Sequence, residues 1–110
     1  MKRGDVVIVA LAGELGKPRP AIVVQSDLLN DADPQSFLVA PLTTSLESAG
    51  YFRPMVEPTA RNGLDAPSAV MTDKIIAVPV RRLRDVIGAL DPDAQRAVDS
   101  ALLLALGLAE

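Results

Sequence analysis

The chain has 110 residues, which is enough for one domain of ordinary size and too few for two independently folding domains. It contains no cysteine and no histidine, so disulfides, Cys/His zinc sites, thiol nucleophiles and imidazole bases are excluded. The net charge is −3, but residues 1–90 carry ten basic and ten acidic side chains, which allows a small basic groove and argues against a broad basic surface.

Short β-branched runs separated by Gly, Pro and Asn fill the first ninety residues. They predict strands over residues 5–12, 21–25, 37–42, 51–56, 68–78 and 84–88. Residues 13–20 contain two glycines and two prolines and are expected to form a loop. Pro41 indicates an edge or a bulge near the end of its strand, and Asn62-Gly63 predicts a tight reversal. Closely spaced short strands of this kind favour a small β-barrel.

A helix is predicted after Asp91, which can cap it, with Pro92 at its first position and Gly107 ending it. One apolar face has the i, i+3, i+4, i+7 spacing expected for packing on a barrel. Leu103, Leu104 and Leu106 extend apolar surface around the rest of its second half. This excess predicts a second partner for the helix.

Neither apolar stretch of the chain has the length of a targeting or membrane segment. Residues 6–12 lack the longer apolar run and small-residue cleavage site of a signal peptide. Residues 101–106 are far shorter than the ~20 residues that cross a bilayer. We therefore expect a cytoplasmic protein.

Arg19 stands between Pro18 and Pro20, which restrict the backbone around it. A guanidinium held in a loop before a buried strand is suited to binding a phosphate or stabilising charge in a transition state. The alternative is a surface salt bridge with Glu14 or Asp27.

Two further segments carry polar groups beside apolar strands. Thr43-Thr44-Ser45 follows an apolar run, so its hydroxyls are expected either at a ligand-binding rim or in a side-chain turn. Asp73-Lys74 is expected inside a strand, where a carboxylate must face solvent or have a partner. Asp73 is therefore a candidate general base or one half of a cross-strand ion pair.

An ordered series of segments spans nearly the whole chain: Lys2-Arg3-Gly4-Asp5-Val6, Arg19-Pro20-Ala21-Ile22-Val23-Val24, Val39-Ala40-Pro41-Leu42-Thr43, Leu64-Asp65-Ala66-Pro67-Ser68-Ala69-Val70, Arg82-Leu83 with Ile87-Gly88, and Leu106-Gly107-Leu108. The first resembles a basic-Gly-acidic-apolar opening, the second an Arg-Pro-apolar strand, and the third an apolar strand that ends in Thr. In this order the segments resemble those of the MazF/PemK family of toxin endoribonucleases from bacterial type II toxin–antitoxin pairs.

The resemblance implies an SH3-like barrel with a C-terminal helix, mainly β with helices (α+β), in a single domain over residues 1–110. It also implies a homodimer, a short acidic and partly disordered antitoxin, and sequence-selective cleavage of single-stranded RNA without a metal or other cofactor. The family's active-site positions correspond to Arg19 and Thr43, and a proposed base of some members corresponds to Asp73. The family usually has Gln where this chain has Lys74, and some members have Arg at the position of Met71.

The residues present are consistent with that chemistry. Attack by a ribose 2′-hydroxyl on the adjacent phosphate leaves a 2′,3′-cyclic phosphate and a 5′-hydroxyl and requires no histidine. Arg19 is assigned to charge stabilisation because guanidinium does not release protons near neutral pH, and Thr43 to orienting the phosphate. The candidate RNA contacts are Lys17, Thr44, Arg53, Lys74 and Arg81.

Two other functions are compatible with a small barrel. The CcdB toxins share this type of barrel and act on DNA gyrase through C-terminal residues that include a tryptophan, but this chain has no tryptophan and ends Leu108-Ala109-Glu110. The other alternative is a catalytically silent barrel that only binds a partner, against which the intact Arg19 and Thr43 argue.

Overall fold

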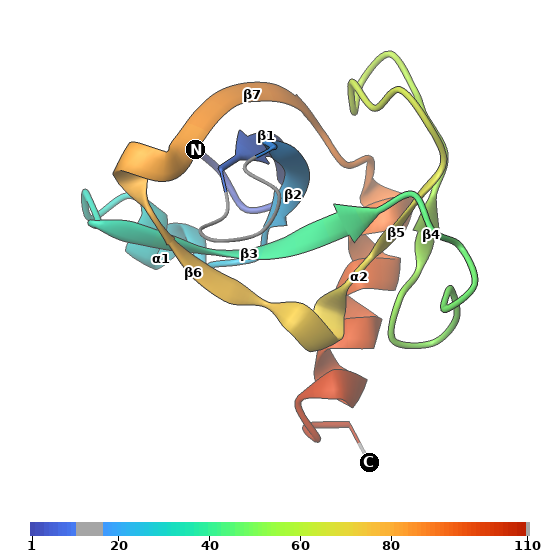
Figure 1. Ribbon diagram of the computed structural model, residues 1–110. Coiled ribbons are helices and arrows are strands. Elements are labelled where there is room, and N and C mark those ends of the chain that lie inside the picture. The colour runs from blue at the N-terminus through green and yellow to red at the C-terminus, as the bar shows by residue number, and fades with distance from the viewer. Residues whose placement is uncertain (11–16, 110) are drawn as a thin grey trace.

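A curled antiparallel sheet and a C-terminal helix make up the computed structural model, which describes residues 1–10 and 17–109 (Figure 1). The strands are β1 (Asp5–Val9), β2 (Arg19–Val23), β3 (Ser36–Thr43), β4 (Met55–Val56), β5 (Ser68–Val70), β6 (Ile76–Pro79) and β7 (Leu83–Ala89). The helices are α1 (Asp27–Asn30) and α2 (Pro92–Ala105), with 3₁₀ turns η1 (Thr72–Lys74) and η2 (Val80–Arg82).

The described strands form one sheet in the order β4-β5-β3-β2-β1-β7, and β6 also pairs with β3. Every pairing is antiparallel. On one side, β3 pairs with β6 over its first half and with β5 at its end, so the sheet curls around β3 into a half-barrel. The small β-barrel with a C-terminal helix expected from the sequence is confirmed.

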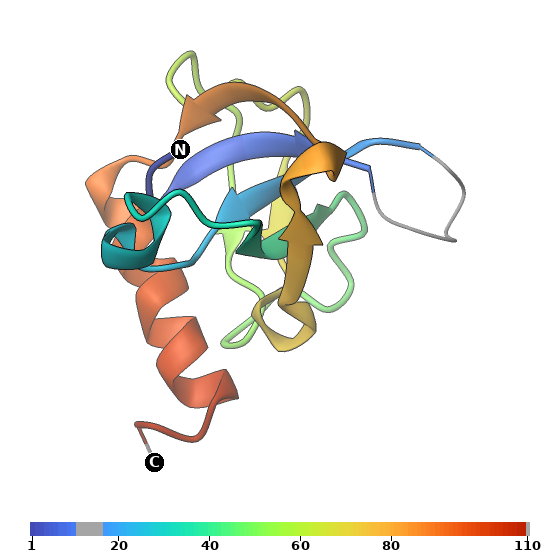
Figure 2. The same ribbon diagram turned by 90° about the vertical axis from the view of Figure 1, so that its left-hand side faces the viewer.

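The two faces of the sheet bury separate apolar clusters, because successive side chains of a strand point to opposite faces. One cluster lies between the sheet and α2 and includes Ile22, Leu42, Val70, Val98 and Leu102. The other lies within the curl and contains Val7, Val9, Ala21, Val23, Phe37, Val39 and Val78. Figure 2 shows α2 lying along one side of the curled sheet.

Helix α2 begins and ends as the sequence predicts. The Asp91 carboxylate accepts a hydrogen bond from the N–H of Ala94 at 2.8 Å, and Pro92 is the first helical residue. Gly107 has φ +75°, and its N–H donates to the carbonyl of Leu104 while the Leu108 N–H donates to that of Leu103. This paired hydrogen bonding is a Schellman cap, which needs a residue that tolerates positive φ.

Two predicted strands are wrong in extent. Residues 51–56 contribute only the short β4, because Gly50 and Arg53 close a tight turn before it. Residues 68–78 form not one bent strand but β5 and β6, separated by η1. Asp73 consequently lies in a 3₁₀ turn rather than in a strand.

Other differences concern strand ends and one missed helix. β1 ends at Val9, and the predicted extension through residues 11–12 lies outside the described residues. Arg19 is the first residue of β2 rather than part of the preceding loop, because it pairs with Val9. The segment between the predicted strands 21–25 and 37–42 contains α1, a single helical turn capped by Ser26.

Pro41 lies neither on an edge strand nor beside a bulge in the observed pairing. Its strand is central, and Pro41 pairs with Ala21 of β2. On the side of β3 away from β2, the pairing with β6 extends only as far as Val39, and the pairing with β5 begins at Leu42. Pro41, which has no N–H, therefore lies where β3 changes partner. The Pro41 carbonyl still accepts a hydrogen bond from the N–H of Met71 at 2.9 Å.

The turn at Asn62-Gly63 gives a test of the fold. Gly63 has φ +71°, and an added Cβ would lie 2.3 Å from the carbonyl oxygen of Ile87. We expect Gly63→Ala to lower the free energy of unfolding by about 1–3 kcal/mol, because backbone must move. Gly50→Ala is the matched control, since no atom lies within 4 Å of its added Cβ. Urea unfolding of both variants checks this, and equal stabilities would contradict the close packing of this turn on β7.

Candidate active site

A pocket of about 250 Å³ lies where β2 begins and β3 ends, lined by Arg19, Pro20, Leu42, Thr43 and Thr44. The register of the two strands explains why these residues meet. Ala21 pairs with Pro41, and the same antiparallel register continued outward places Arg19 opposite Thr43. The structure therefore brings the two residues assigned to the active site in the sequence into one pocket.

The pocket continues the apolar face inside the curl. Ala21 and Val39 on this face are fully buried, and the alternation of side chains places Arg19 and Thr43 on the same face at the end of the strands. Both side chains are only half-buried. A guanidinium and a hydroxyl thus stand at the open end of an apolar interior, where water competes less with a bound anion.

Arg19 is held by the start of β2 and by the prolines on either side. The ion-pair alternative with Asp27 is wrong, because no ion pair joins Arg19 to Asp27 among the described residues. The Asp27 carboxylate instead accepts hydrogen bonds from the N–H of Arg3 at 2.7 Å and from Asn30 at 3.0 Å. These two bonds, the Arg3 N–H first, lower the pKa of Asp27. The other alternative partner, Glu14, lies outside the described residues.

Thr43 ends β3 and makes a side-chain turn. Its Oγ1 accepts a hydrogen bond from the N–H of Ser45 at 3.1 Å. This confirms the turn that the sequence suggested as an alternative to a binding role, but the two are compatible. A hydroxyl that accepts one bond keeps its own hydrogen to donate, so the Thr43 O–H is available to an anion in the pocket.

Asp73 does not line this pocket and is paired with Arg53. Arg53 Nε donates to Asp73 Oδ1 at 2.9 Å, and Nη2 donates to Oδ2 at 3.1 Å. The hydrogen bonds from Arg53 lower the pKa of Asp73, and the same bonds raise the pKa of Arg53. An ion pair was the alternative to a general base, and it is present, although it joins a loop to a 3₁₀ turn rather than two strands.

The remaining predicted RNA contacts are distributed unevenly. Thr44 lines the pocket, while Lys17 is exposed two residues before Arg19. Lys74 is exposed next to Asp73 in η1, and Arg53 is engaged with Asp73. The structure places Arg81 in a different pocket.

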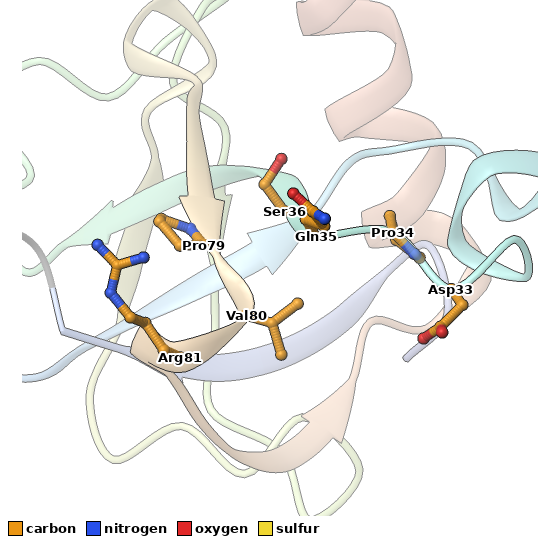
Figure 3. A pocket seen from close by; sticks show the side chains of 7 residues that line it. All are labelled: Asp33, Pro34, Gln35, Ser36, Pro79, Val80 and Arg81. Carbon is orange, nitrogen blue, oxygen red and sulfur yellow. The ribbon is translucent and has the colours of Figure 1, made fainter.

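That second pocket is open, has a volume of about 730 Å³ and includes Ser36, at the opposite end of β3 from Thr43 (Figure 3). Arg81 and Asp33 lie at its two ends, and the Arg81 guanidinium points away from the Asp33 carboxylate (Figure 3). No ion pair joins them among the described residues. The structure therefore does not bring Arg81 into the pocket of Arg19 and Thr43.

The sequence analysis missed the contacts that fix the segment after Thr44. Arg53 also donates from Nη1 to Ser48 Oγ at 3.0 Å, and the Thr72 hydroxyl donates to the carbonyl of Phe52. Arg53 and Asp73 are twenty residues apart, and neither has a local pattern that identifies the other. Only the fold brings them together.

Residues 1–10 and 17–109 contain no group of three acidic side chains that could hold a metal ion. They also contain no helix with the length and hydropathy needed to span a membrane.

The pairing of Asp73 with Arg53 predicts a pH-dependent contribution to stability. The pKa of Asp73 is lower in the folded chain than its ordinary value of about 3.9, so the stabilisation is present above about pH 4 and is lost as the pH falls through the folded pKa. We expect Asp73→Asn to lower the free energy of unfolding at pH 7 by about 1 kcal/mol or less, because the pair is partly exposed. The difference should shrink in strong acid.

Urea unfolding at pH 7 and in strong acid measures this difference. Asp65→Asn is the control, since Asp65 is exposed and belongs to none of the ion pairs among the described residues. A loss of stability in Asp73→Asn that is equally large at both pH values would show that the pair does not act through charge.

Comparison with known proteins connects this site to a family. Residues 2–106 match the model of the PemK-like, MazF-like toxins of type II toxin–antitoxin systems. The chain is 38% identical over 110 residues to the probable endoribonuclease MazF of Mycolicibacterium smegmatis, covering 99% of each chain.

Two solved structures share the fold. The Mycobacterium tuberculosis toxin MazF-mt6 superposes with a TM-score of 0.81 at 27% identity, covering 96% of this chain and 99% of that one. An endoribonuclease from a mycobacterial species, solved in complex with its cognate antitoxin, gives a TM-score of 0.83 at 23% identity, covering 100% and 98%. The chain belongs to the PemK-like, MazF-like toxin family of type II toxin–antitoxin systems.

Proposed function

We propose that this protein is a sequence-selective endoribonuclease that cleaves single-stranded RNA without a metal ion. The observation that carries the proposal is the position of Arg19 opposite Thr43 in one pocket at the open end of the sheet. The name of the Mycolicibacterium relative, a probable endoribonuclease, supports the same activity. The absence of histidine and cysteine from the sequence is compatible with it, because this chemistry requires neither.

The reaction is a transesterification within the RNA. The ribose 2′-oxygen forms a bond to the adjacent phosphorus and loses its proton, while the bond from phosphorus to the 5′-oxygen breaks and that oxygen takes up a proton. The products are a 2′,3′-cyclic phosphate and a 5′-hydroxyl. Extra negative charge develops on the non-bridging phosphate oxygens, and a fixed donor is worth most at such a point.

Arg19 and Thr43 are the catalytic residues in this proposal. The Arg19 guanidinium donates to the phosphate and stabilises the developing charge. The Thr43 hydroxyl, whose oxygen is oriented by the Ser45 N–H, donates its hydrogen to a second phosphate oxygen. Both groups are fixed by paired strands, which reduces the reorganisation that the reaction requires.

For Asp73 we propose a positioning role in place of the base suggested by the sequence. Both of its carboxylate oxygens accept hydrogen bonds from Arg53, and its lowered pKa makes it a weak proton acceptor. Lys17, Thr44 and Lys74 remain proposed RNA contacts around the pocket, whereas Arg53 acts through the loop that it anchors. Arg81 is proposed to contact RNA only beyond the pocket, since it lines a separate one.

We also propose that the protein acts in the cytoplasm as a homodimer of single domains that is inhibited by an antitoxin. A groove of about 370 Å³ between β3 and α2 is lined mainly by apolar side chains, including Leu38, Ile75, Leu103 and Leu106. Leu103 and Leu106 are 46% and 54% exposed, so a second copy of the chain would cover them. An acidic, initially disordered antitoxin segment would suit the Arg19 pocket, as the family implies.

Arg19 and Thr43 provide the direct test of the catalytic proposal. We expect Arg19→Ala to reduce kcat on a single-stranded RNA in EDTA by roughly 10²- to 10³-fold, the usual cost of losing one fixed donor. Thr43→Val should also reduce kcat strongly, while Thr43→Ser, which keeps the hydroxyl, should retain most activity. Arg61→Ala is the matched control, because Arg61 is exposed and lies far from the pocket. Its carbonyl accepts a hydrogen bond from the N–H of Ala89, which pairs with Asp5 at the end of β1 opposite to the pocket.

Thermal unfolding of the same variants separates catalysis from folding, because half-exposed side chains at a strand end contribute little to stability. If both Arg19→Ala and Thr43→Val cleaved RNA as fast as the wild-type protein, the proposed active site would be wrong.

Leu103 tests the homodimer. We expect Leu103→Glu to dissociate the dimer without unfolding the chain. The Leu103 side chain lines the groove and is 46% exposed, so it does not belong to the core. Ala97→Glu places the same charge at an exposed position of α2 that does not line the groove. Light scattering gives the mass of each variant. A wild-type protein that remains an 11.6 kDa monomer at micromolar concentration would refute the dimer.

A further inference from the structure

Two of the three aromatic side chains of this protein are exposed on adjacent residues. The sequence contains one tyrosine, two phenylalanines and no tryptophan. Phe37 is buried within the curl of the sheet, whereas Tyr51 and Phe52 are 86% and 50% exposed. Exposure of neighbouring aromatic rings leaves their faces available to a ligand.

Tyr51 and Phe52 form the tip of a tight turn. The N–H of Gly50 donates to the carbonyl of Arg53 at 3.0 Å, and the N–H of Arg53 donates to the carbonyl of Gly50 at 3.2 Å. These reciprocal bonds close residues 50–53 into a hairpin-like turn, here called the aromatic turn. The two rings are consequently presented by a defined backbone rather than by an open loop.

The aromatic turn is anchored at its base to η1 and to Ser48. The two hydrogen bonds from Arg53 to Asp73 and the bond to Ser48 fix one side, and the Thr72 hydroxyl donates to the carbonyl of Phe52. Thr72 is almost fully buried, and Arg53 is only 19% exposed. The tip of the turn is therefore exposed to solvent, while its base is held in a fixed position by buried contacts.

The strand register places the end of the segment that carries this turn two strands away from Thr43. Thr43 pairs with Ala69 of β5, and Ala69 pairs with Met55 of β4. Adjacent strands are about 4.8 Å apart, so Met55 lies roughly 10 Å from Thr43. The segment that leaves the pocket at Thr44 returns to the sheet at Met55. Phe52 lies three residues before Met55, and its carbonyl faces Thr72 at the start of η1.

We propose that Tyr51 and Phe52 form a stacking subsite for a nucleobase of the RNA that flanks the cleaved bond. The proposal rests on the proposed function and names a further part of its substrate site. Single-stranded RNA offers unstacked bases, and stacking on exposed aromatic rings is a common way to bind them. Asp73 is paired with Arg53 and is followed by the exposed Lys74, so the base of the turn adds no unpaired negative charge that would repel phosphates.

The geometry favours a base over a protein partner at this turn. The two exposed rings lie between Gly50 and Arg53, and the Arg53 guanidinium donates to Ser48 and Asp73. A continuous apolar groove exists elsewhere, between β3 and α2. Stacking on a ring tolerates any base, so this subsite would add affinity and fix the path of the strand rather than read a sequence.

The fluorescence of Tyr51 can be followed directly, because the sequence contains no other tyrosine and no tryptophan. The binding experiment uses the Thr43→Val protein and a single-stranded RNA oligonucleotide, whose affinity is followed independently by the anisotropy of a terminal dye. We expect the tyrosine fluorescence to be quenched as the RNA binds. In the protein without RNA, acrylamide should quench the same fluorescence freely, as an 86% exposed side chain requires.

Substitutions then separate the two rings from the rest of the loop. Tyr51→Ala and Phe52→Ala, each combined with Thr43→Val, should weaken RNA binding roughly 5- to 100-fold, the range found for loss of one stacked base. Tyr51→Phe keeps the ring and should bind like the parent. Leu46→Ala is the matched control, since Leu46 is an exposed apolar residue of the same segment.

An abasic-site series locates the stacked nucleotide. When the base that contacts Tyr51 is removed, Tyr51→Ala should cause no further loss of affinity, whereas it should still weaken binding of oligonucleotides with abasic sites elsewhere. This position should lie within a few nucleotides of the cleavage site that the wild-type protein produces.

Three outcomes would overturn the subsite without refuting the proposed function. RNA that binds and is cleaved normally by Tyr51→Ala and Phe52→Ala proteins would remove it while leaving the proposed endoribonuclease intact. Tyrosine fluorescence that is shielded from acrylamide before RNA is added would assign the turn to an interface between copies of the chain. Quenching by the antitoxin but not by RNA would assign it to that partner. An absence of any RNA binding or cleavage would instead refute the proposed function, and the subsite with it.

Discussion

The antiparallel pairing of β2 with β3 is the constraint on which the rest of the structure depends. It aligns Ala21 with Pro41 and Val23 with Val39, so both strands present the same alternation of faces to the two cores. A slip of one residue would move every side chain of one strand to the opposite face. Arg19 would then leave the side on which Thr43 lies, and the side chains of the slipped strand would be exchanged between the two apolar clusters.

β3 passes this constraint on to the remaining strands. It is the only described strand that pairs with β2, β5 and β6, and it changes partner at Pro41, where no N–H is available. Beyond this point Leu42 packs against the α2 side of the sheet, while Thr43 opens to solvent. The pocket therefore forms where the central strand β3 extends beyond the apolar core on one face of the sheet.

Local patterns predicted the elements whose causes are local. The α2 helix was foreseen because Asp91, Pro92 and Gly107 act within one turn of their own positions. The order of segments also predicted a shared role for Arg19 and Thr43, and the structure brings both into one pocket. The division of residues 68–78 into two strands and the pairing of Arg53 with Asp73 were not foreseen, because tertiary contacts between segments far apart in sequence decide them.

The construction of the pocket from paired strands also limits how the protein can be silenced. Arg19 and Thr43 are held by the ladders that carry both cores, and such elements open only when the whole domain unfolds. A partner that displaced Arg19 relative to Thr43 would have to break these strand pairings, which is costly in free energy. Inhibition of the proposed active site is therefore expected to occur by occlusion, competitive with RNA and reversed at once when the occluding segment is removed.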